Sequence, residues 1–261
     1  MSSYWLVRRS GILGTSVGCK LFASAYFLYK RYEDHLSALL RSHPSLVQGG
    51  NVLDVGANIG YTAGVLAQAI DPGRVVYAFE PEPFNYRMLQ RTATRPRFGA
   101  RIITRQCAIG AKDGTAQLWL NRRHPADHRV ITSQFRQADS AVTRITVPLM
   151  SIDSFLESHP GPVSFIKIDV QGFERPVCEG MKKTLDQNPC LSVVLEYAPA
   201  MMRELGFSPP DLIDLLIKHG LQCYLVGPEG TLSPGLPSRI EDSEYIDLLF
   251  SRHPLACNKG I

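Results

Sequence analysis

The residues with the strongest chemical signal form a glycine turn, Asp54-Val55-Gly56-Ala57-Asn58-Ile59-Gly60, between an apolar run and a helical pattern. In an open α/β sheet, such a turn lets a ligand approach the backbone outside the carboxyl ends of the strands. The next expected strand ends in an acid, Glu80, and a carboxylate there can accept hydrogen bonds from both ribose hydroxyls. The spacing therefore predicts a nucleoside-binding site.

The differences between this turn and other glycine motifs narrow the range of possible ligands. A dinucleotide fingerprint that starts at Gly56 needs glycines at positions 58 and 61, and Asn58 and Tyr61 stand there, which disfavours NAD. The chain also has no P-loop motif. Asp54, two residues before the first glycine, suits a ligand with positive charge, such as the amino group and sulfonium of S-adenosyl-L-methionine (SAM). The alternative is a glycine turn that serves only helix–strand packing.

Three acids are candidates for catalysis. Asp169 ends a buried strand, and Gly172 after it frees the backbone to expose the carboxylate. If the ligand is SAM, the reaction is methyl transfer, an in-line displacement whose rate depends on holding the acceptor close to the sulfonium. A carboxylate at 169 can orient an acceptor hydroxyl and take its proton. Glu196, at the end of a neighbouring strand, and Glu174 could complete an acidic pocket. Glu174 equally suits the first turn of a helix, where an acid is favourable for the helix dipole.

Two other site types are not favoured. No metal site is predicted, because neither Asp169 nor Glu196 has an adjacent acid. The segment Ser208-Pro209-Pro210-Asp211 has an acid where the motif that stacks a flipped base has an aromatic residue, and it precedes a late helix. We therefore expect a small-molecule or glycan acceptor and no nucleic-acid partner. The sequence gives no indication of the oligomeric state.

The elements that must position these residues alternate along the chain from residue 50, as in a sheet with crossover helices. The expected strands are 51–55, 74–80, 101–107, 115–120, 142–149, 163–169, 191–197, 221–226 and 245–250, and the expected helices are 61–70, 83–94, 152–157, 174–185 and 210–219. Residues 121–140 are expected to form a long loop, whose bases Arg122, Arg123 and Arg129 either face solvent or recognise an anionic acceptor.

These elements predict an α/β fold, Rossmann-like, with a mostly parallel sheet and helices on both faces. The domain is expected at residues 46–261, after an N-terminal helical extension at residues 1–45. A length of 261 residues, with 44% hydrophobic and 20% charged residues, is typical of a globular chain with a large core and excludes a disordered one.

The charge of the chain is unevenly distributed, although the net charge is only +4. Residues 1–32 have no acid, and their bases are Arg8, Arg9, Lys20, Lys30 and Arg31. With its aromatic side chains this segment predicts peripheral contact with a membrane, or a helix that packs on the domain. A spanning helix is disfavoured because Lys20 and several glycines interrupt the apolar stretch. The six cysteines form no C-x-x-C pair, which indicates a reducing compartment, the cytoplasm.

Several ordered motifs together resemble the FkbM family of SAM-dependent methyltransferases. They are VLDVGANIGYTA, VVYAFEPEPFNYRML, the CAIG turn with DGTAQLWL, SIDSF and FIKIDVQGFE, within about residues 50–200. The resemblance implies a cofactor site in which the glycine turn lines SAM, Glu80 holds the ribose and the next turn lies beside the adenine; its residues are Asp54, Gly56, Asn58, Gly60, Glu80, Cys107 and Ala108. The chain departs from the family at Gln171, which usually is Glu, and at Thr92, which usually is Asn.

The sequence and the resemblance predict a SAM-dependent methyltransferase that methylates a hydroxyl of a sugar, glycolipid or secondary metabolite. Two alternatives stay open. One is an amide N-methyltransferase, and the other is a non-catalytic, membrane-associated binding protein that keeps the glycine turn only for packing.

Overall fold

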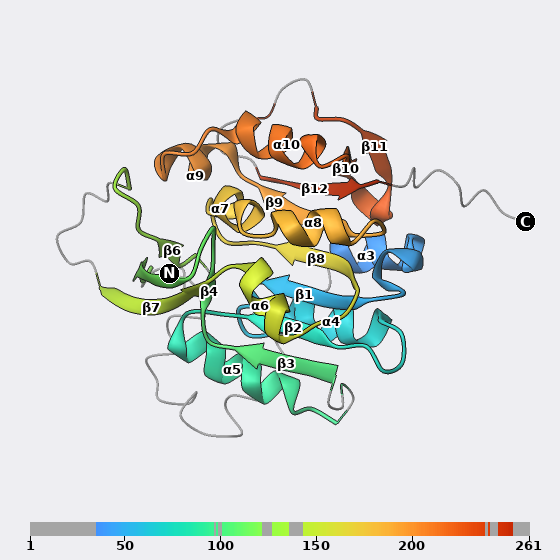
Figure 1. The fold of residues 1–261 in the computed structure, drawn as a ribbon, viewed down its shortest axis with the longest axis horizontal. Helices are drawn as coiled ribbons and strands as arrows, with labels where there is room; N and C mark the ends of the chain where they lie inside the picture. The colour runs from blue at the N-terminus through green and yellow to red at the C-terminus, as the bar shows by residue number, and fades with distance from the viewer. Residues whose placement is uncertain are drawn as a thin grey trace, which may run out of the picture.

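The computed structural model describes residues 35–96, 98, 101–121, 127–135, 143–237, 240 and 245–252. In this part of the chain the strands form an eight-stranded sheet and a four-stranded sheet (Figure 1). From edge to edge the large sheet consists of β11 (Leu232–Pro234), β10 (Gln222–Val226), β12 (Ile246–Ser251), β9 (Ser192–Tyr197), β8 (Val163–Ile168), β1 (Asn51–Val55), β2 (Val76–Phe79) and β3 (Ile102–Arg105). The predicted membrane-contacting segment at 1–32 lies outside the described residues.

The large sheet is parallel from β9 to β3. Its central strands β1, β8 and β9 are covered on both faces, which explains why their sequences are nearly continuous apolar runs. β12 lies between β9 and β10 and is antiparallel to both. The strand order reverses between β1 and β8, and such a switch point opens a crevice at the carboxyl ends of the strands. The predicted Rossmann-like α/β fold is confirmed.

Helices cover both faces of the large sheet. One face packs against α6 (Ile152–Ser158), α7 (Glu174–Glu179), α8 (Lys182–Gln187), α9 (Pro199–Glu204) and α10 (Pro209–Lys218). Figure 1 shows α6 and α8 in front of the sheet. The other face packs against α3 (His35–Ser42), the 3-10 helix η2 (Pro44–Val47), α4 (Tyr61–Ala69) and α5 (Pro83–Ala93).

The predicted N-terminal extension is described only from residue 35 on. There α3 buries Leu39 and Leu40 in the core, together with Leu46 and Val47 of η2. The start of α3 is thus held beside the sheet, while the turn η4 (Pro228–Gly230) packs against the same helix. In the part of the chain that the structure describes, every helix is too short or too polar for a membrane crossing.

The second sheet was not anticipated from the sequence. It consists of β4 (Ala108–Ile109), β7 (Arg144–Met150), β5 (Gly114–Trp119) and β6 (Arg129–Val130), with β5 antiparallel to β6 and β7. The expected long loop at 121–140 therefore contains a short strand, β6. Leu118, Val130 and Val147 of this sheet pack against Phe173 and Leu205. The small sheet thus forms a wall beside the carboxyl end of β8.

The single helix expected at 174–185 is wrong, because α7 ends before Gly180 and α8 begins after it. A Cβ atom at Gly180 would lie 2.1 Å from the carbonyl oxygen of Gly110. The carbonyl of Gly180 accepts a hydrogen bond from Asp153 N–H at 2.9 Å. A close crossing with a distant segment therefore ends the helix, and local sequence does not reveal it.

Candidate active site

A cavity of about 600 Å³ lies at the carboxyl ends of β1, β2, β8 and β9, within the usual range of ligand pockets of about 300–1,000 Å³. Most of the predicted site residues line it: Gly56, Asn58, Glu80, Cys107, Ala108, Asp169 and Glu196. Asp54, Gly60 and Glu174 are not among the lining residues. The structure therefore brings the expected cofactor turn and two of the three expected catalytic acids to one cavity.

Gly56 joins the glycine turn directly to the end of β8. Its φ is +83°, and a Cβ atom there would lie 1.8 Å from the carbonyl oxygen of Asp169. The backbone N–H of Asp169 donates to the carbonyl of Val55 at 3.0 Å. Only glycine permits this backbone contact together with this conformation, so the position of the turn fixes the position of Asp169.

Gly60 supports the turn from behind and does not contact the cavity. Its φ is +89°, and a Cβ atom there would lie 2.8 Å from Leu89 Cδ1 of α5. Thr92, also on α5, donates its hydroxyl to the carbonyl of Ile59 at 2.8 Å. The residue at 92, where the chain departs from the family, thus serves the packing of α5 on the turn.

Glu80 links the glycine turn to the end of β2. Its Oε2 accepts from the N–H of Asn58 at 2.9 Å, and its Oε1 accepts from the N–H of Glu82 at 2.9 Å. Burial raises the pKa of Glu80 to about 8, although these N–H groups oppose the shift. A carboxylate has about four lone-pair sites, so both oxygens retain acceptor capacity toward a ligand in the cavity.

Asp54 lies under the cavity, on the same face of the sheet as Lys167, its partner in the register of β1 and β8. Its carboxyl is fully buried, and burial raises its pKa to about 6 while the charge of Lys167 lowers it. The carboxyl of Asp54 therefore acts on the site through its field on Lys167, across the wall of the cavity.

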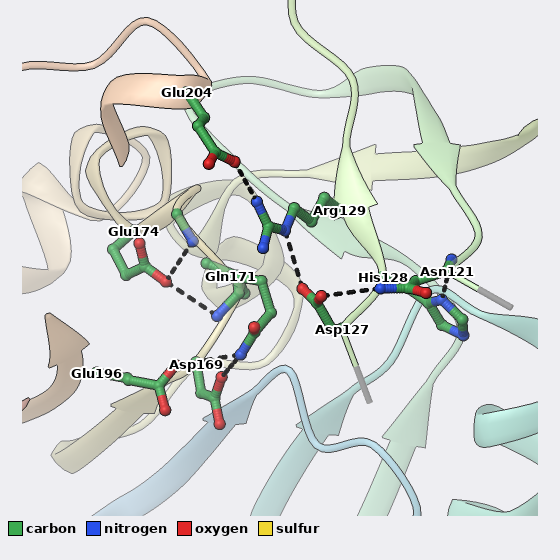
Figure 2. Close-up of polar contacts among 11 residues, drawn as sticks. Asn121, Asp127, His128, Arg129, Asp169, Gln171, Glu174, Glu196 and Glu204 are labelled. Atoms are coloured by element: carbon green, nitrogen blue, oxygen red, sulfur yellow. Dashed lines mark hydrogen bonds and ion pairs between the residues drawn. The ribbon is translucent and has the colours of Figure 1, made fainter. Parts of the chain in front are cut away.

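The acids that line the cavity are tied together by polar contacts (Figure 2). Lys167 Nζ lies 2.9 Å from Asp169 Oδ2. Gln171 Nε2 donates to Asp169 Oδ1 at 2.8 Å and to Glu196 Oε2 at 3.1 Å. Asp169 thus accepts from a lysine and an amide at once, which orients its carboxylate at the end of β8.

The charge states in this group follow from burial and neighbouring charge. Burial, together with the charge of Asp169, raises the pKa of Glu196 well above its ordinary value, which favours the protonated form of this carboxyl group. Burial alone would lower the pKa of Lys167, but the charges of Asp169 and Asp54 raise it above its ordinary value. The charges around Asp169 therefore favour an ammonium at Lys167 and the protonated form of Glu196.

Lys167, Gln171 and Asp247 are site residues that the sequence analysis did not assign. Asp247 of β12 lies opposite Glu196 in the strand register, and burial raises its pKa. Its Oδ2 lies 3.4 Å from Nδ1 of His35, at the start of α3. A charged residue at one position of an otherwise buried strand is the signal that could have revealed Lys167 and Asp247.

Glu174 supports the loop after β8 from below. Its Oε1 accepts from the N–H of Val170 and of Gly172, both at 3.1 Å, and burial raises its pKa to about 7. Its carboxyl is fully buried. The structure thus places Glu174 behind the site, where it holds the backbone on both sides of Gln171.

The basic residue Arg129 of the expected loop is buried rather than solvated. Figure 2 shows it between two acids: its Nε lies 2.9 Å from Asp127 Oδ1, and its Nη1 lies 2.6 Å from Glu204 Oε2. The expectation that Arg129 faces solvent is therefore wrong, whereas its recognition of an anionic acceptor stays a prediction, because a guanidinium has five N–H donors and these two contacts use only part of them. Arg122 and Arg123 lie outside the described residues.

Comparisons with known proteins give one family match. The family model "Methyltransferase FkbM domain" matches residues 54–223. No curated protein matches the chain. Similar solved structures include a methyltransferase FkbM from Methylobacillus flagellatus KT, with 18% identity, a TM-score of 0.47, and coverage of 78% of this chain but only 43% of that one.

Two further solved structures are O-methyltransferases. The enzyme from Bacillus cereus, in complex with S-adenosylhomocysteine (SAH), has 11% identity and a TM-score of 0.49, with 84% of this chain and 79% of that chain covered. TomG from Streptomyces achromogenes, involved in tomaymycin synthesis and in complex with SAM, has 10% identity and a TM-score of 0.48, with 84% and 78% covered.

Proposed function

Because the chain belongs to the FkbM family of SAM-dependent methyltransferases, we propose that it methylates a hydroxyl group of a small-molecule or glycan acceptor, with Asp169 as the proton acceptor. The observation that carries the proposal is the position of Asp169. It lines the cavity, accepts hydrogen bonds from Lys167 and Gln171, and touches the cofactor turn through Gly56.

The residues of the turn fit SAM. At Gly56 the backbone lies where a side chain would block the contact with β8, and Asn58 and Glu80 line the cavity beside it. We assign the ribose hydroxyls to Glu80 and the adenine to the surface at Cys107 and Ala108, which lines the same cavity. SAM, when bound, supplies an electrophilic methyl group.

Asp169 has the geometry of a general base. Its carboxylate is held by Lys167 and Gln171, so it can orient an acceptor hydroxyl without the entropy cost of ordering itself. As the acceptor oxygen is alkylated, its proton passes to Asp169. Glu196, whose protonated form is favoured by burial and by the charge of Asp169, can donate a hydrogen bond to a second oxygen of the acceptor. Such a paired donor and acceptor fits neighbouring hydroxyls, as in a sugar.

The cofactor assignment is tested by calorimetry on the purified protein. We expect binding of SAM and SAH and no binding of NAD. Glu80→Ala should weaken SAH by about 1–3 kcal/mol, the range for leaving the buried hydrogen-bond partners of the removed group unsatisfied. Glu157→Ala, in an exposed acid on α6, is the matched control and should leave the affinity unchanged. Tighter binding of NAD than of SAH would refute the assignment.

The acceptor is tested through the host. Small-molecule extracts of a strain without the gene should contain a compound that lacks one methyl group, and purified protein with SAM should restore it. The position of the methyl group, read by NMR, decides between the alternatives. A methylated amide would favour the N-methyltransferase, and a protein that binds no SAH would favour a non-catalytic binding role.

We also propose a cytoplasmic location with peripheral membrane contact through residues 1–32. The basis is the charge of this segment, which has bases and aromatic residues but no acid. Each base near an anionic surface contributes on the order of 1 kcal/mol. Deletion of residues 1–30 should abolish sedimentation with anionic liposomes and leave the SAH affinity unchanged. Equal sedimentation of the truncated and full chains would rule out membrane contact through this segment.

A further inference from the structure

Gln171 joins the two acids that line the cavity. Its Nε2 lies 2.8 Å from Asp169 Oδ1 and 3.1 Å from Glu196 Oε2 (Figure 2). A side-chain amide nitrogen has two N–H donors, and the two bonds direct one donor to each carboxyl group. Gln171 thereby bridges an acid at the end of β8 and an acid on β9.

The backbone holds Gln171 in this position from both sides. Its φ of +56° is unusual for a residue with a side chain. The N–H groups of its neighbours, Val170 and Gly172, both donate to Glu174 Oε1. A Cβ atom at Gly172 would lie 2.8 Å from the carbonyl oxygen of Met201, so the loop also packs tightly on α9. These contacts direct the amide of Gln171 into the cavity wall.

The amide of Gln171 affects the protonation of Asp169 and Glu196 through the hydrogen bonds that it donates to them. The charged groups that act on Glu196 or on its charged neighbours come from several elements: Asp54 on β1, Lys167 on β8, Asp247 on β12, Glu174 on α7 and His35 on α3. Lys167 Nζ lies 2.9 Å from Oδ2 of Asp169. The amide of Gln171 therefore serves the other oxygen, Oδ1, and the carboxyl of Glu196. Donated N–H groups favour the ionised form of a carboxyl group.

We propose that Gln171 is a positioning residue that holds Asp169 and Glu196 together as one acid–base pair and sets the pH range in which the pair can accept a proton. The inference rests on the proposed function of Asp169. Gln171 itself exchanges no proton, and it acts through the two carboxyl groups.

The test compares Gln171→Met and Gln171→Glu with the wild-type full chain. Both new side chains are unbranched and close to Gln in size, so the backbone cost of the positive φ stays the same. Gln117→Met, at an exposed position of β5, is the control. The side-chain carboxyl carbons are labelled with ¹³C and titrated by NMR with SAH bound, and the signals are assigned with Asp169→Asn and Glu196→Gln.

Gln171→Met should move the two carboxyl titration midpoints to higher pH by about one unit, which corresponds to a tenfold change in the proton equilibrium. The sign follows because the variant removes donors that favour the ionised forms. Gln171→Glu should move them further, since a third carboxyl adds repulsion. Gln117→Met should leave them in place.

Midpoints that stay within about 0.2 pH units of wild type in both Gln171 variants, while thermal unfolding shows folded protein, would overturn the inference. That result is separable from a failure of the proposed function, because the latter is read from turnover of Asp169→Asn. Should the Met variant fail to fold, the Glu variant alone decides, since it keeps a polar group of the same shape.

Discussion

Asp169→Asn should lower methyl transfer by about two to four orders of magnitude, the scale for a positioned acid–base group. Asn keeps the shape of Asp and can still contact Lys167, but it cannot accept the proton of the acceptor hydroxyl. The SAH affinity should stay within a few fold, because the side chain of Asp169 contacts Lys167 and Gln171, and Asn keeps the shape that these contacts need.

Turnover is measured as transfer of labelled methyl from SAM to the extract of a strain without the gene. Asp186→Asn, in an exposed acid of α8 paired with His219, is the matched control and should retain wild-type turnover. Near-wild-type turnover of Asp169→Asn would remove this residue from the mechanism. Thermal unfolding of each variant separates a catalytic loss from a folding defect.

Gly56→Ala should destabilise the folded protein and also weaken binding of the cofactor. An alanine at a φ of +83° costs about 1–2 kcal/mol, and overpacking against the carbonyl of Asp169 adds about 1–3 kcal/mol. We expect a loss of stability of about 2–5 kcal/mol, the sum of these two effects. SAH binding should weaken at least tenfold, because the glycine turn must move away from β8 to make room for the side-chain methyl of the new alanine.

Gly73→Ala is the control that separates the collision with Asp169 from the backbone strain of an alanine at positive φ. Gly73 has a φ of +80°, and an added Cβ atom there would meet nothing within 4 Å. The control therefore shares the conformational cost but lacks the collision with Asp169. Denaturant unfolding and calorimetry with SAH are the measurements. Equal losses of stability in the two variants would show that the contact between the turn and β8 is unimportant.

The sequence was sufficient for the parts of the site that lie at the ends of strands. Apolar runs predicted β1, β2, β8 and β9, and Glu80, Asp169 and Glu196 were selected because an acid follows or ends such a run. Polar side chains at carboxyl ends of parallel strands converge on one edge of the sheet. That convergence needs no knowledge of the register, so the sequence pattern was adequate for it.

The polar network around Asp169 could not be predicted without the pairing register of the strands. Lys167 was overlooked because it lies within the apolar strand β8, and its partner Asp54 becomes a neighbour only when β1 and β8 pair. Asp247 is brought beside Glu196 by the insertion of β12 between β9 and β10. The strands expected at 115–120 and 142–149 correspond to β5 and β7, but β4 and β6, at two residues each, are too short to show periodicity, so the separate second sheet was not predicted.

Because β12 is inserted beside β9, the two sides of the cavity are lined by different segments of the sequence. The glycine turn, Glu80 and the turn at Cys107 come from residues 54–107, whereas His35 and Asp247 come from segments far apart in sequence that meet beyond β9. Mutations near the two ends of the described chain can therefore remodel one half of the cavity while the nucleoside half stays intact. With the nucleoside assigned to the glycine turn as we propose, the opposite side of the cavity can change in sequence while the methyl-donor side is kept.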